Sequence, residues 1–401
     1  MKGIISMCGT FILLFFVCLT AVAQIQLEAQ IIDGNTKSPL MGAYISTDEN
    51  NATLSNAEGS FSILVQSDET LLHISYLGYE EVTLNAKVLP KVIKLQPIAY
   101  DIKPVFVLGA DKKQFISNLY EKYKQLAKSV KRKNCNYFYR QTIQDQGKCS
   151  EIIEAIFNMD SEFGLKNTKI VKGRYAVLPS DSSNVYTTFT NFYYYLQLRY
   201  FNKNKTKKNQ LIAPLSDVSL DYYDVDIDLM FNNNGNDMYV AHFVPKKQYY
   251  RLLIKGDLYI DPLTLRVFRY DAYLPVPYTN LDRTQKGETV AHLIFDIDIA
   301  EEFPKINSIV ASMEYSFAPK DDLVINANLS ALLVKLENKN TIKGGKKLTG
   351  HNILLDEVYN LEDDAEFWRN NQIIKRTPLE ESTLKLFEEK NLIGNYEINQ
   401  P

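Results

Sequence analysis

Three aspartates alternate along one stretch of the chain, and their spacing is the clearest hint of metal chemistry. Asp224, Asp226 and Asp228 match the start of a calcium-binding loop. That loop also needs glycine at its sixth position and glutamate at its twelfth, where this chain has Leu229 and Gly235. The calcium loop is therefore absent, and alternate carboxylates on a strand indicate the solvated face of an antiparallel sheet.

The histidines and cysteines do not form a metal-ligand pattern. The chain has no His-Glu-x-x-His sequence and no paired cysteines. Three histidines fall in apolar strands, where a histidine hydrogen-bonded within the sheet is the ordinary explanation. We expect no zinc carboxypeptidase site, no other metal and no cofactor. The four histidines, spread one to a region, are His73, His242, His292 and His351.

Motifs for covalent catalysis and for phosphate binding are missing as well. Neither Gly-x-Ser-x-Gly nor Gly-x-x-x-x-Gly-Lys-Ser/Thr occurs. A pair of carboxylates for glycoside hydrolysis could always be chosen from 48 Asp and Glu residues, so no pair carries information. We predict no catalytic residue and expect that the protein is not an enzyme.

One basic segment beside aromatic residues offers a surface for anionic partners. The segment 203–208 has four lysines and follows the aromatic residues of 192–195 and the pair Tyr200-Phe201. Cations beside rings suit anionic lipid head groups or a glycan. The simpler interpretation is a solvated basic loop next to a half-buried aromatic element.

Composition and charge limit the class of protein. A chain of 401 residues with 45% hydrophobic and 23% charged side chains is globular and long enough for more than one core. Its 45 Lys and Arg against 48 Asp and Glu give a net charge of -3, so we expect no nucleic acid partner. The 26 Tyr and 20 Phe favour a β-rich fold.

The first residues have the pattern of a secretory signal peptide, residues 1–23. Lys2 provides the positive charge, 11–19 is the apolar core, and Ala21-Val-Ala23 is a cleavage site of small residues. The apolar core is shorter than the roughly 20 residues of a membrane-spanning helix. The mature chain is therefore predicted to be exported, to lie in the periplasm or at the outer membrane, and to have no transmembrane helix.

Two cysteines remain after the signal peptide, in an oxidising compartment where a disulfide is allowed. The turn at Asp145-Gln-Gly-Lys148 predicts a hairpin that pairs Gln144 with Cys149. Cys135 would then lie many residues from Cys149 along the ladder, so the hairpin argues against a bridge between them.

Residues 24–98 have the alternation of a small antiparallel β-sandwich. Turn residues such as Asp33-Gly-Asn35 and Leu77-Gly78 separate the short strands. The predicted strands are 25–32, 43–46, 60–65, 71–76 and 91–95.

Four stretches of this region carry a family pattern: Ile31-Ile-Asp33, Pro39-Leu-Met-Gly-Ala43, Thr53-Leu-Ser-Asn-Ala-Glu-Gly-Ser-Phe61 and Ile74-Ser-Tyr-Leu-Gly-Tyr79. With them the region resembles the carboxypeptidase-like regulatory domain, a transthyretin-like seven-strand sandwich of exported Bacteroidetes proteins. That family has no catalytic residues, so the resemblance implies folding and docking rather than peptide hydrolysis.

Residues 99–133 are predicted to form a linker and one amphipathic helix that begins at Asp111. Its basic end, from Lys128 to 131–133, suits the negative pole of a helix. The apolar stripe has the helical period and consists of Phe115, Leu119, Tyr123, Leu126 and Val130.

Residues 134–360 are predicted to form longer strands in an antiparallel sheet curled around that helix. The strands 136–143 and 151–157 form the first expected pair. The fold class is α+β and mainly β, a sandwich followed by a curled sheet packed on helices. The other predicted strands are 223–229, 238–244, 250–260, 265–270, 290–297, 309–315 and 329–336.

The second region and the tail carry four further motifs: Tyr137-Phe-Tyr-Arg140, Gly256-Asp-Leu-Tyr-Ile-Asp-Pro262, Glu366-Phe-Trp-Arg369 and Ile374-Lys-Arg-Thr-Pro378. With the helix before them, they resemble the segment that follows the regulatory domain in uncharacterised Bacteroidetes envelope proteins. The Gly256-x-x-Tyr-Ile-Asp hairpin is also similar to the unclosed barrel of periplasmic lipoprotein carriers.

Residues 361–401 are predicted to form a helical tail. Thr377-Pro378 begins a helix in which Glu380 completes a capping box. We expect the helix to reach about Lys390 and to bury Leu379, Leu384 and Phe387.

These patterns favour an exported, non-enzymatic protein that binds or docks another envelope protein. Two alternatives stay open: a periplasmic carrier that holds a lipid or a peptide in the curved sheet, and an uncharacterised hydrolase. A carrier needs an apolar cavity that side chains leave unfilled, which separates it from a docking protein.

Overall fold

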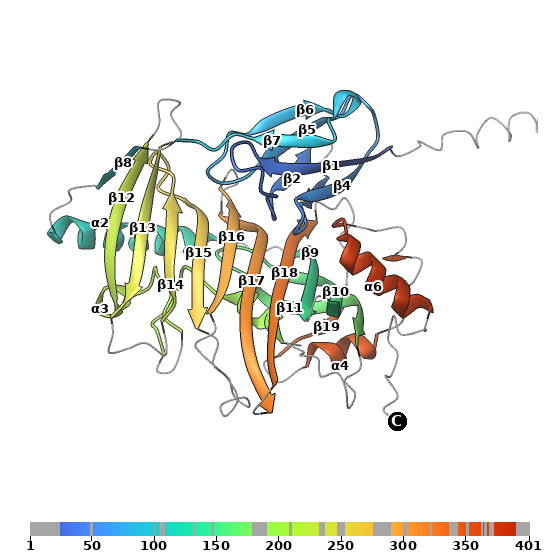
Figure 1. The fold of residues 1–401 in the computed structure, drawn as a ribbon. Helices are drawn as coiled ribbons and strands as arrows, with labels where there is room; N and C mark the ends of the chain where they lie inside the picture. The colour runs from blue at the N-terminus through green and yellow to red at the C-terminus, as the bar shows by residue number, and fades with distance from the viewer. Residues whose placement is uncertain are drawn as a thin grey trace, which may run out of the picture. The chain divides into compact units, whose positions relative to one another are not determined.

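The computed structural model divides the chain into two compact units, residues 1–95 and 96–401 (Figure 1). The predicted signal peptide, 1–23, lies outside the described residues. No helix in the described part of the chain is long and apolar enough to cross a membrane. The described residues are 25–48, 51–99, 101–104, 109–130, 134–145, 148–178, 191–207, 211–231, 237–246, 253–275, 290–299, 303–320, 323–336, 344–349, 353–361, 364, 367–368 and 373–389.

The N-terminal unit is the predicted β-sandwich. One sheet has the strand order β4-β1-β7 and the other β3-β2-β5-β6. All pairs are antiparallel except β1 with β7, which run parallel. The strands β3 and β6 were not predicted. The elements are β1 (Ile25–Asp33), β2 (Tyr44–Thr47), β3 (Ala52–Leu54), β4 (Ser60–Val65), β5 (Leu71–Ser75), β6 (Val82–Asn85), η1 (Ala86–Val88) and β7 (Val92–Leu95).

Alternation along these strands explains the sandwich. Alternate residues of a strand point to the same face, and Ile31 of β1, Phe61 of β4 and Leu72 of β5 are buried in the space between the sheets. The two inner faces thus share one hydrophobic core, which is the main source of stability of such a unit.

The large unit contains one curled antiparallel sheet, as predicted (Figure 1). Its described strands follow the order β19-β11-β10-β9-β18-β17-β16-β15-β14-β13-β12-β8. They are β8 (Asp101–Pro104), β9 (Asn134–Asp145), β10 (Lys148–Asp160), β11 (Lys166–Val177), β12 (Tyr223–Phe231), β13 (Met238–Pro245), β14 (Lys255–Ile260), β15 (Val267–Pro275), β16 (Val290–Asp298), β17 (Lys305–Lys320), β18 (Leu323–Leu336) and β19 (Lys346–Lys347).

The predicted hairpin of the large unit is confirmed. Asp145 lies opposite Lys148, Gln144 opposite Cys149, and Cys135 opposite Met159. Cys135 and Cys149 are not joined by a disulfide, as the register requires.

Some predicted boundaries were wrong. The strand expected from Leu265 begins at Val267, because Leu265 has a φ of 52° and belongs to the turn after Asp261. In that turn the Leu265 N–H donates to the Asp261 carbonyl at 2.8 Å. The strand 309–315 is part of the longer β17, and β11 was not predicted.

The predicted helix is α2 (Gly109–Ser129), which begins two residues earlier than expected. Leu119 and Tyr123 are buried against the sheet, whereas Phe115, Leu126 and Val130 are half-buried at the margin of the same core. Tyr123 also accepts a hydrogen bond from the Val267 N–H at 2.7 Å. We call the sheet face that packs on α2 the inner face, and the opposite one the outer face.

The predicted C-terminal helix is α6 (Pro378–Glu389), and its capping box is confirmed. The Glu380 N–H donates to Thr377 Oγ1 at 3.1 Å, and the Thr377 N–H donates to Glu380 Oε2 at 2.9 Å. Leu384 is buried against Ile152 and Ala176 on the outer face. The predicted contact of the Phe387 side chain lies outside the described residues. The remaining helices are η2 (Phe192–Gln197), α3 (Ser219–Tyr222) and α4 (Leu354–Tyr359).

Candidate functional site

The side chains of Asp224, Asp226 and Asp228 lie on the outer face of β12, and the pairing of β12 with β13 brings His242 to the same face. Asp224 and Asp226 are exposed and Asp228 is half-buried. His242 lies between two carboxylates, with Nε2 at 3.3 Å from Asp228 Oδ2 and Nδ1 at 2.7 Å from Asp257 Oδ1. The hydrogen bond with Asp257 raises the pKa of His242 above its usual value, against the effect of burial. In the described part of the chain, no three His, Cys, Asp or Glu residues are grouped to hold a metal ion.

The other described histidines contact side chains of the neighbouring strands in their own sheets. His292 stacks on Tyr273 of the neighbouring strand, with ring centroids 4.4 Å apart and planes 2° apart. Burial lowers the pKa of His292, which favours its neutral form. His73 in the N-terminal unit lies with Nδ1 3.1 Å from Thr83 Oγ1. The sequence candidate His351 lies outside the described residues.

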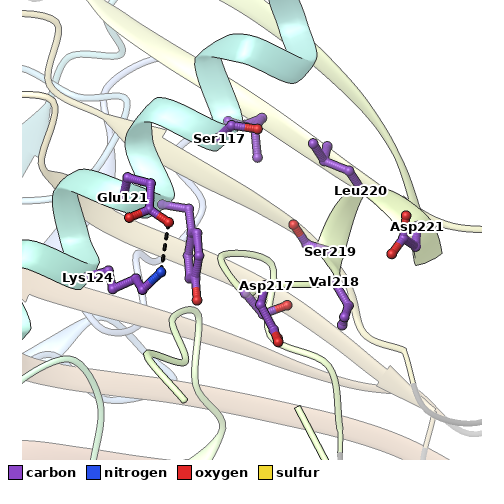
Figure 2. A pocket seen from close by; sticks show the side chains of 11 residues that line it. Ser117, Glu121, Lys124, Asp217, Val218, Ser219, Leu220 and Asp221 are labelled. Atoms are coloured by element: carbon purple, nitrogen blue, oxygen red, sulfur yellow. Dashed lines mark hydrogen bonds and ion pairs between the residues drawn. The ribbon is translucent and has the colours of Figure 1, made fainter. Parts of the chain in front are cut away.

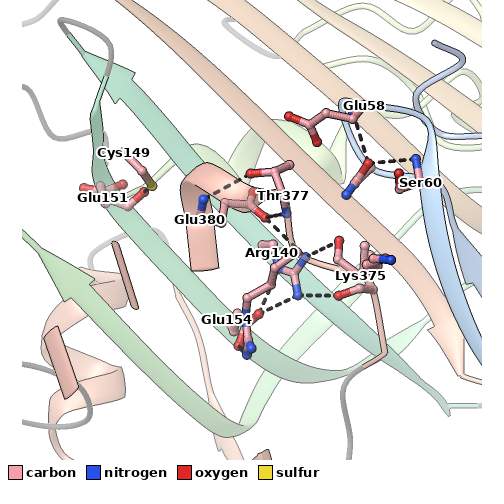
Figure 3. Close-up of polar contacts among 12 residues, drawn as sticks. Glu58, Ser60, Arg140, Cys149, Glu151, Glu154, Lys375, Thr377 and Glu380 are labelled. Atoms are coloured by element: carbon pink, nitrogen blue, oxygen red, sulfur yellow. Dashed lines mark hydrogen bonds and ion pairs between the residues drawn. The ribbon is translucent and has the colours of Figure 1, made fainter. Parts of the chain in front are cut away.

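A buried cluster of charges on the outer face was not recognised from the sequence (Figure 3). Glu154 of β10 lies between Arg140 of β9 and Arg174 of β11, because the three residues are direct neighbours across the sheet. Arg140 donates to Glu154 Oε1 through Nε at 2.8 Å, and Arg174 donates to Oε2 through Nε at 2.7 Å. Arg376, just before α6, lies with Nη2 3.4 Å from the same Oε2.

The same cluster attaches the C-terminal segment to the sheet. Arg140 Nη2 donates to the Ile374 carbonyl at 2.7 Å, and Arg140 Nη1 lies 3.8 Å from Glu380 Oε2. The guanidinium of Arg174 covers the ring of Trp368, with its carbon 4.7 Å from the ring centroid. Burial alone would raise the pKa of Glu154, but the surrounding arginines hold it well below its usual value.

A signal for this cluster was present in part. Arg140 and Arg376 belong to the stretches Tyr137-Phe-Tyr-Arg140 and Ile374-Lys-Arg-Thr-Pro378, whose spacing in the chain does not reveal that they meet. A charged residue amid apolar strand residues, as Glu154 is in 151–157, indicates a buried ion pair when the flanking positions are core. The partner of such a charge cannot be read without the register.

The inner face is packed with aromatic side chains. Tyr200 and Phe201 are buried, with ring centroids 6.0 and 5.5 Å from that of Tyr123. These rings therefore belong to the core, whereas the neighbouring Lys203, Lys205 and Lys207 are exposed to solvent. The described part of this segment, 203–207, is thus a solvated basic loop beside buried rings, the simpler of the two interpretations. Lys208 lies outside the described residues.

One cavity of about 280 Å³ lies between α2 and the segment 216–221 (Figure 2). Its wall includes Tyr120, Glu121 and Lys124 of α2, and Lys124 Nζ lies 2.9 Å from Glu121 Oε1. Asp217 on the opposite wall accepts hydrogen bonds from the Thr206 N–H at 3.1 Å and hydroxyl at 2.8 Å. This mixed polar lining differs from the continuous apolar wall that a lipid tail needs.

In the N-terminal unit, the polar residues of the quoted motifs close the unit's own turns. Asp33 accepts hydrogen bonds from the Tyr79 hydroxyl at 2.6 Å and from the Asn35 N–H at 2.6 Å. Asn56 Oδ1 accepts from the Ser60 N–H at 2.9 Å. Gly59 has a φ of 71°, and a Cβ there would lie 2.3 Å from the Ile31 carbonyl oxygen, so only glycine fits.

Comparison with protein families agrees with this geometry. Residues 27–105 match the family model of the CarboxypepD_reg-like domain. The N-terminal unit is a CarboxypepD_reg-like domain. The match extends beyond the sandwich into β8, which pairs with β12 in the sheet of the large unit. The CarboxypepD_reg-like domain is thus continuous in sequence with an edge strand of that sheet.

A comparison with curated proteins found no match. Among solved structures, a DUF1329 family protein from Desulfovibrio piger is 13% identical, with 55% of this chain and 92% of that chain covered and a TM-score of 0.23. A protein of unknown function from Bacteroides fragilis is 12% identical, with 78% and 97% covered and a TM-score of 0.16.

Proposed function

We propose that the protein is an exported, non-enzymatic binding protein of the cell envelope, in which the CarboxypepD_reg-like domain docks on an envelope protein. The observation that carries this proposal is the use of the motif residues in that domain. Asp33, Asn56 and Tyr79 direct their polar atoms to the domain's own turns and to one another. Polar atoms that are used in hydrogen bonds of this kind stabilise the fold of the domain. This use supports a role in docking rather than in catalysis.

The large unit supports a binding role better than a carrier role. A carrier in the curved sheet needs an unfilled apolar space on the inner face. Where that face is described, α2 and the rings of Phe192, Tyr200 and Phe201 pack into one core with it. The carrier role is therefore the less favoured one, and the experiment below distinguishes it from docking.

A crosslinked capture from the cell envelope tests the docking role. The bait is the mature chain, residues 24–401, and the comparison is the chain that lacks residues 24–95. Far-UV circular dichroism and cooperative thermal unfolding show whether the shortened chain keeps its fold. We expect one defined envelope protein to be enriched with the mature chain and lost with the shortened one.

Two results would argue against the proposal. Equal recovery of the same partner with both chains would move the docking surface to the large unit. Absence of a specific partner, together with a stoichiometric lipid in organic extracts of the purified protein, would favour the carrier.

A further inference from the structure

The charges of the outer-face cluster do not balance. Three guanidinium groups, those of Arg140, Arg174 and Arg376, face two carboxylates, those of Glu154 and Glu380. Glu154 has only 3% of its side chain exposed, and Glu380 has 8%. Counted over the described residues, the cluster therefore holds one positive charge in excess in a largely buried place, where an unpaired charge is costly.

The excess charge belongs to Arg376. Both oxygens of Glu154 already have a second close donor, Arg140 Nη2 at 2.7 Å from Oε1 and Arg174 Nη2 at 2.5 Å from Oε2. Arg376 Nη2 lies farther away, at 3.4 Å from Oε2. The Arg376 Nε is buried and has no hydrogen-bond partner among the described residues. A buried guanidinium nitrogen without an acceptor leaves a strong donor unsatisfied.

Arg174 and Arg376 are the two members of the cluster that solvent reaches. Their side chains are 15% and 16% exposed, whereas Arg140 is only 3% exposed. Arg174 is held in place by the ring of Trp368 and by Glu154. Both guanidinium groups approach Glu154 Oε2 and so lie side by side. A guanidinium group presents its N–H donors in the planar geometry that fits oxyanions.

We propose that Arg174 and Arg376 form a binding site for an oxyanion, a carboxylate or a phosphate group. The anion adds a third negative charge beside the two partly exposed guanidinium groups. Trp368 gives the site one apolar wall. The site is independent of the docking proposal, since it needs only residues of the large unit.

Calorimetric titration of the mature chain tests this site with two probes, inorganic phosphate and acetate, in Tris chloride at constant ionic strength. We expect saturable binding of at least one probe at a single site. Arg376→Gln should weaken it about tenfold or more, because it removes a charged hydrogen-bond donor. The matched control is Arg266→Gln, which changes another half-buried arginine whose Nη1 donates to the Ile299 carbonyl at 2.6 Å; we expect it to leave the affinity unchanged.

The stability of the variant provides a second readout. Arg376→Gln leaves two arginines with two carboxylates, so its thermal midpoint in chloride alone should equal or exceed that of the wild type. Phosphate or acetate should then raise the midpoint of the wild type and of Arg266→Gln more than that of Arg376→Gln. If Arg376→Gln fails to fold, Arg376→Lys keeps the charge without the planar donors and should also bind more weakly.

The probes distinguish the two sources of the oxyanion. Tighter binding of phosphate assigns the site to phosphate groups, and tighter binding of acetate assigns it to carboxylates. The proposal is overturned if neither probe gives saturable heat, or if Arg376→Gln binds as tightly as the wild type.

Discussion

In the CarboxypepD_reg-like domain the polar side chains of the motifs lie at turns, whereas in the large unit the polar clusters lie across neighbouring strands of one sheet face. Asp33 and Asn56 accept hydrogen bonds from backbone N–H groups two to four residues away. Glu154 instead meets Arg140 and Arg376, which are 14 and 222 residues away. Local polar contacts leave a readable motif, while cross-strand contacts leave almost none.

Removal of the central carboxylate should give the largest effect. Glu154→Gln leaves three arginines in the cluster with Glu380 alone, and the cost of breaking a buried ion pair is about 3–5 kcal/mol in the free energy of unfolding. Urea unfolding of the large unit measures this loss. Glu121→Gln, in an exposed pair on α2, is the control and should change stability by less than about 1 kcal/mol. Equal effects of the two variants would contradict the assignment of Glu154 as the centre of the cluster.

Two glycines test the turn contacts of the N-terminal unit. Gly59 and Gly78 both have positive φ values, of 71° and 85°, but only Gly59 has neighbours where a Cβ would lie. Gly59→Ala should cost about 2–3 kcal/mol or more, since it combines backbone strain with a clash, and Gly78→Ala about 1 kcal/mol. Thermal unfolding of the N-terminal unit compares them. A loss for Gly78→Ala as large as that for Gly59→Ala would show that the close approach to Ile31 does not matter.

The helix cap of the C-terminal segment should give a smaller effect. Thr377→Ala removes the side-chain oxygen that accepts from the Glu380 N–H, which costs about 1 kcal/mol. Ser382→Ala, on the exposed side of the same helix, should be near neutral. Chemical unfolding of both variants measures the contribution of the capping box, and equal losses for the two would show that the box does not stabilise α6.

The two outer-face histidines should give the smallest and most specific effect, a pair of opposite pH dependences. The pKa of His242 is raised in the folded state. Its contribution to the free energy of unfolding is therefore complete below pH 6.5 and is lost as the pH rises through the pKa of the folded state. The pKa of His292 is lowered, so its contribution is present above pH 6.5 and is lost as the pH falls.

Unfolding free energies measured from pH 5 to 8 check these signs. The wild type should lose stability above pH 6.5 through His242, and this decrease should be absent in His242→Gln. It should also lose stability below pH 6.5 through His292, and this decrease should be absent in His292→Gln. The same pH profile for both variants would contradict the opposite environments of the two rings.

Much of the fold could be predicted because its signals are local. The alternation in 223–229, the turn at Asp145 and the capping box at Thr377 each depend on residues within one element. They gave the correct strand, hairpin and helix. The start of β15 was missed because the left-handed backbone of Leu265 depends on the turn around it.

The polar clusters could not be predicted, because they depend on register and strand order. Asp228 belongs to an acidic strand and His242 to a separate apolar one, and only the β12–β13 pairing places the two side chains on one face. The pairing of β18 with β9 likewise brings together strands from distant parts of the chain. Single-chain patterns do not specify such pairings.

The central claim is that the CarboxypepD_reg-like domain alone carries the docking surface. Competition tests it most directly: residues 24–98, once shown to unfold cooperatively, are added in excess to the complex of the mature chain with its captured envelope partner. The account predicts that the domain displaces the mature chain in a concentration-dependent manner. A folded domain that fails to displace it would contradict the claim.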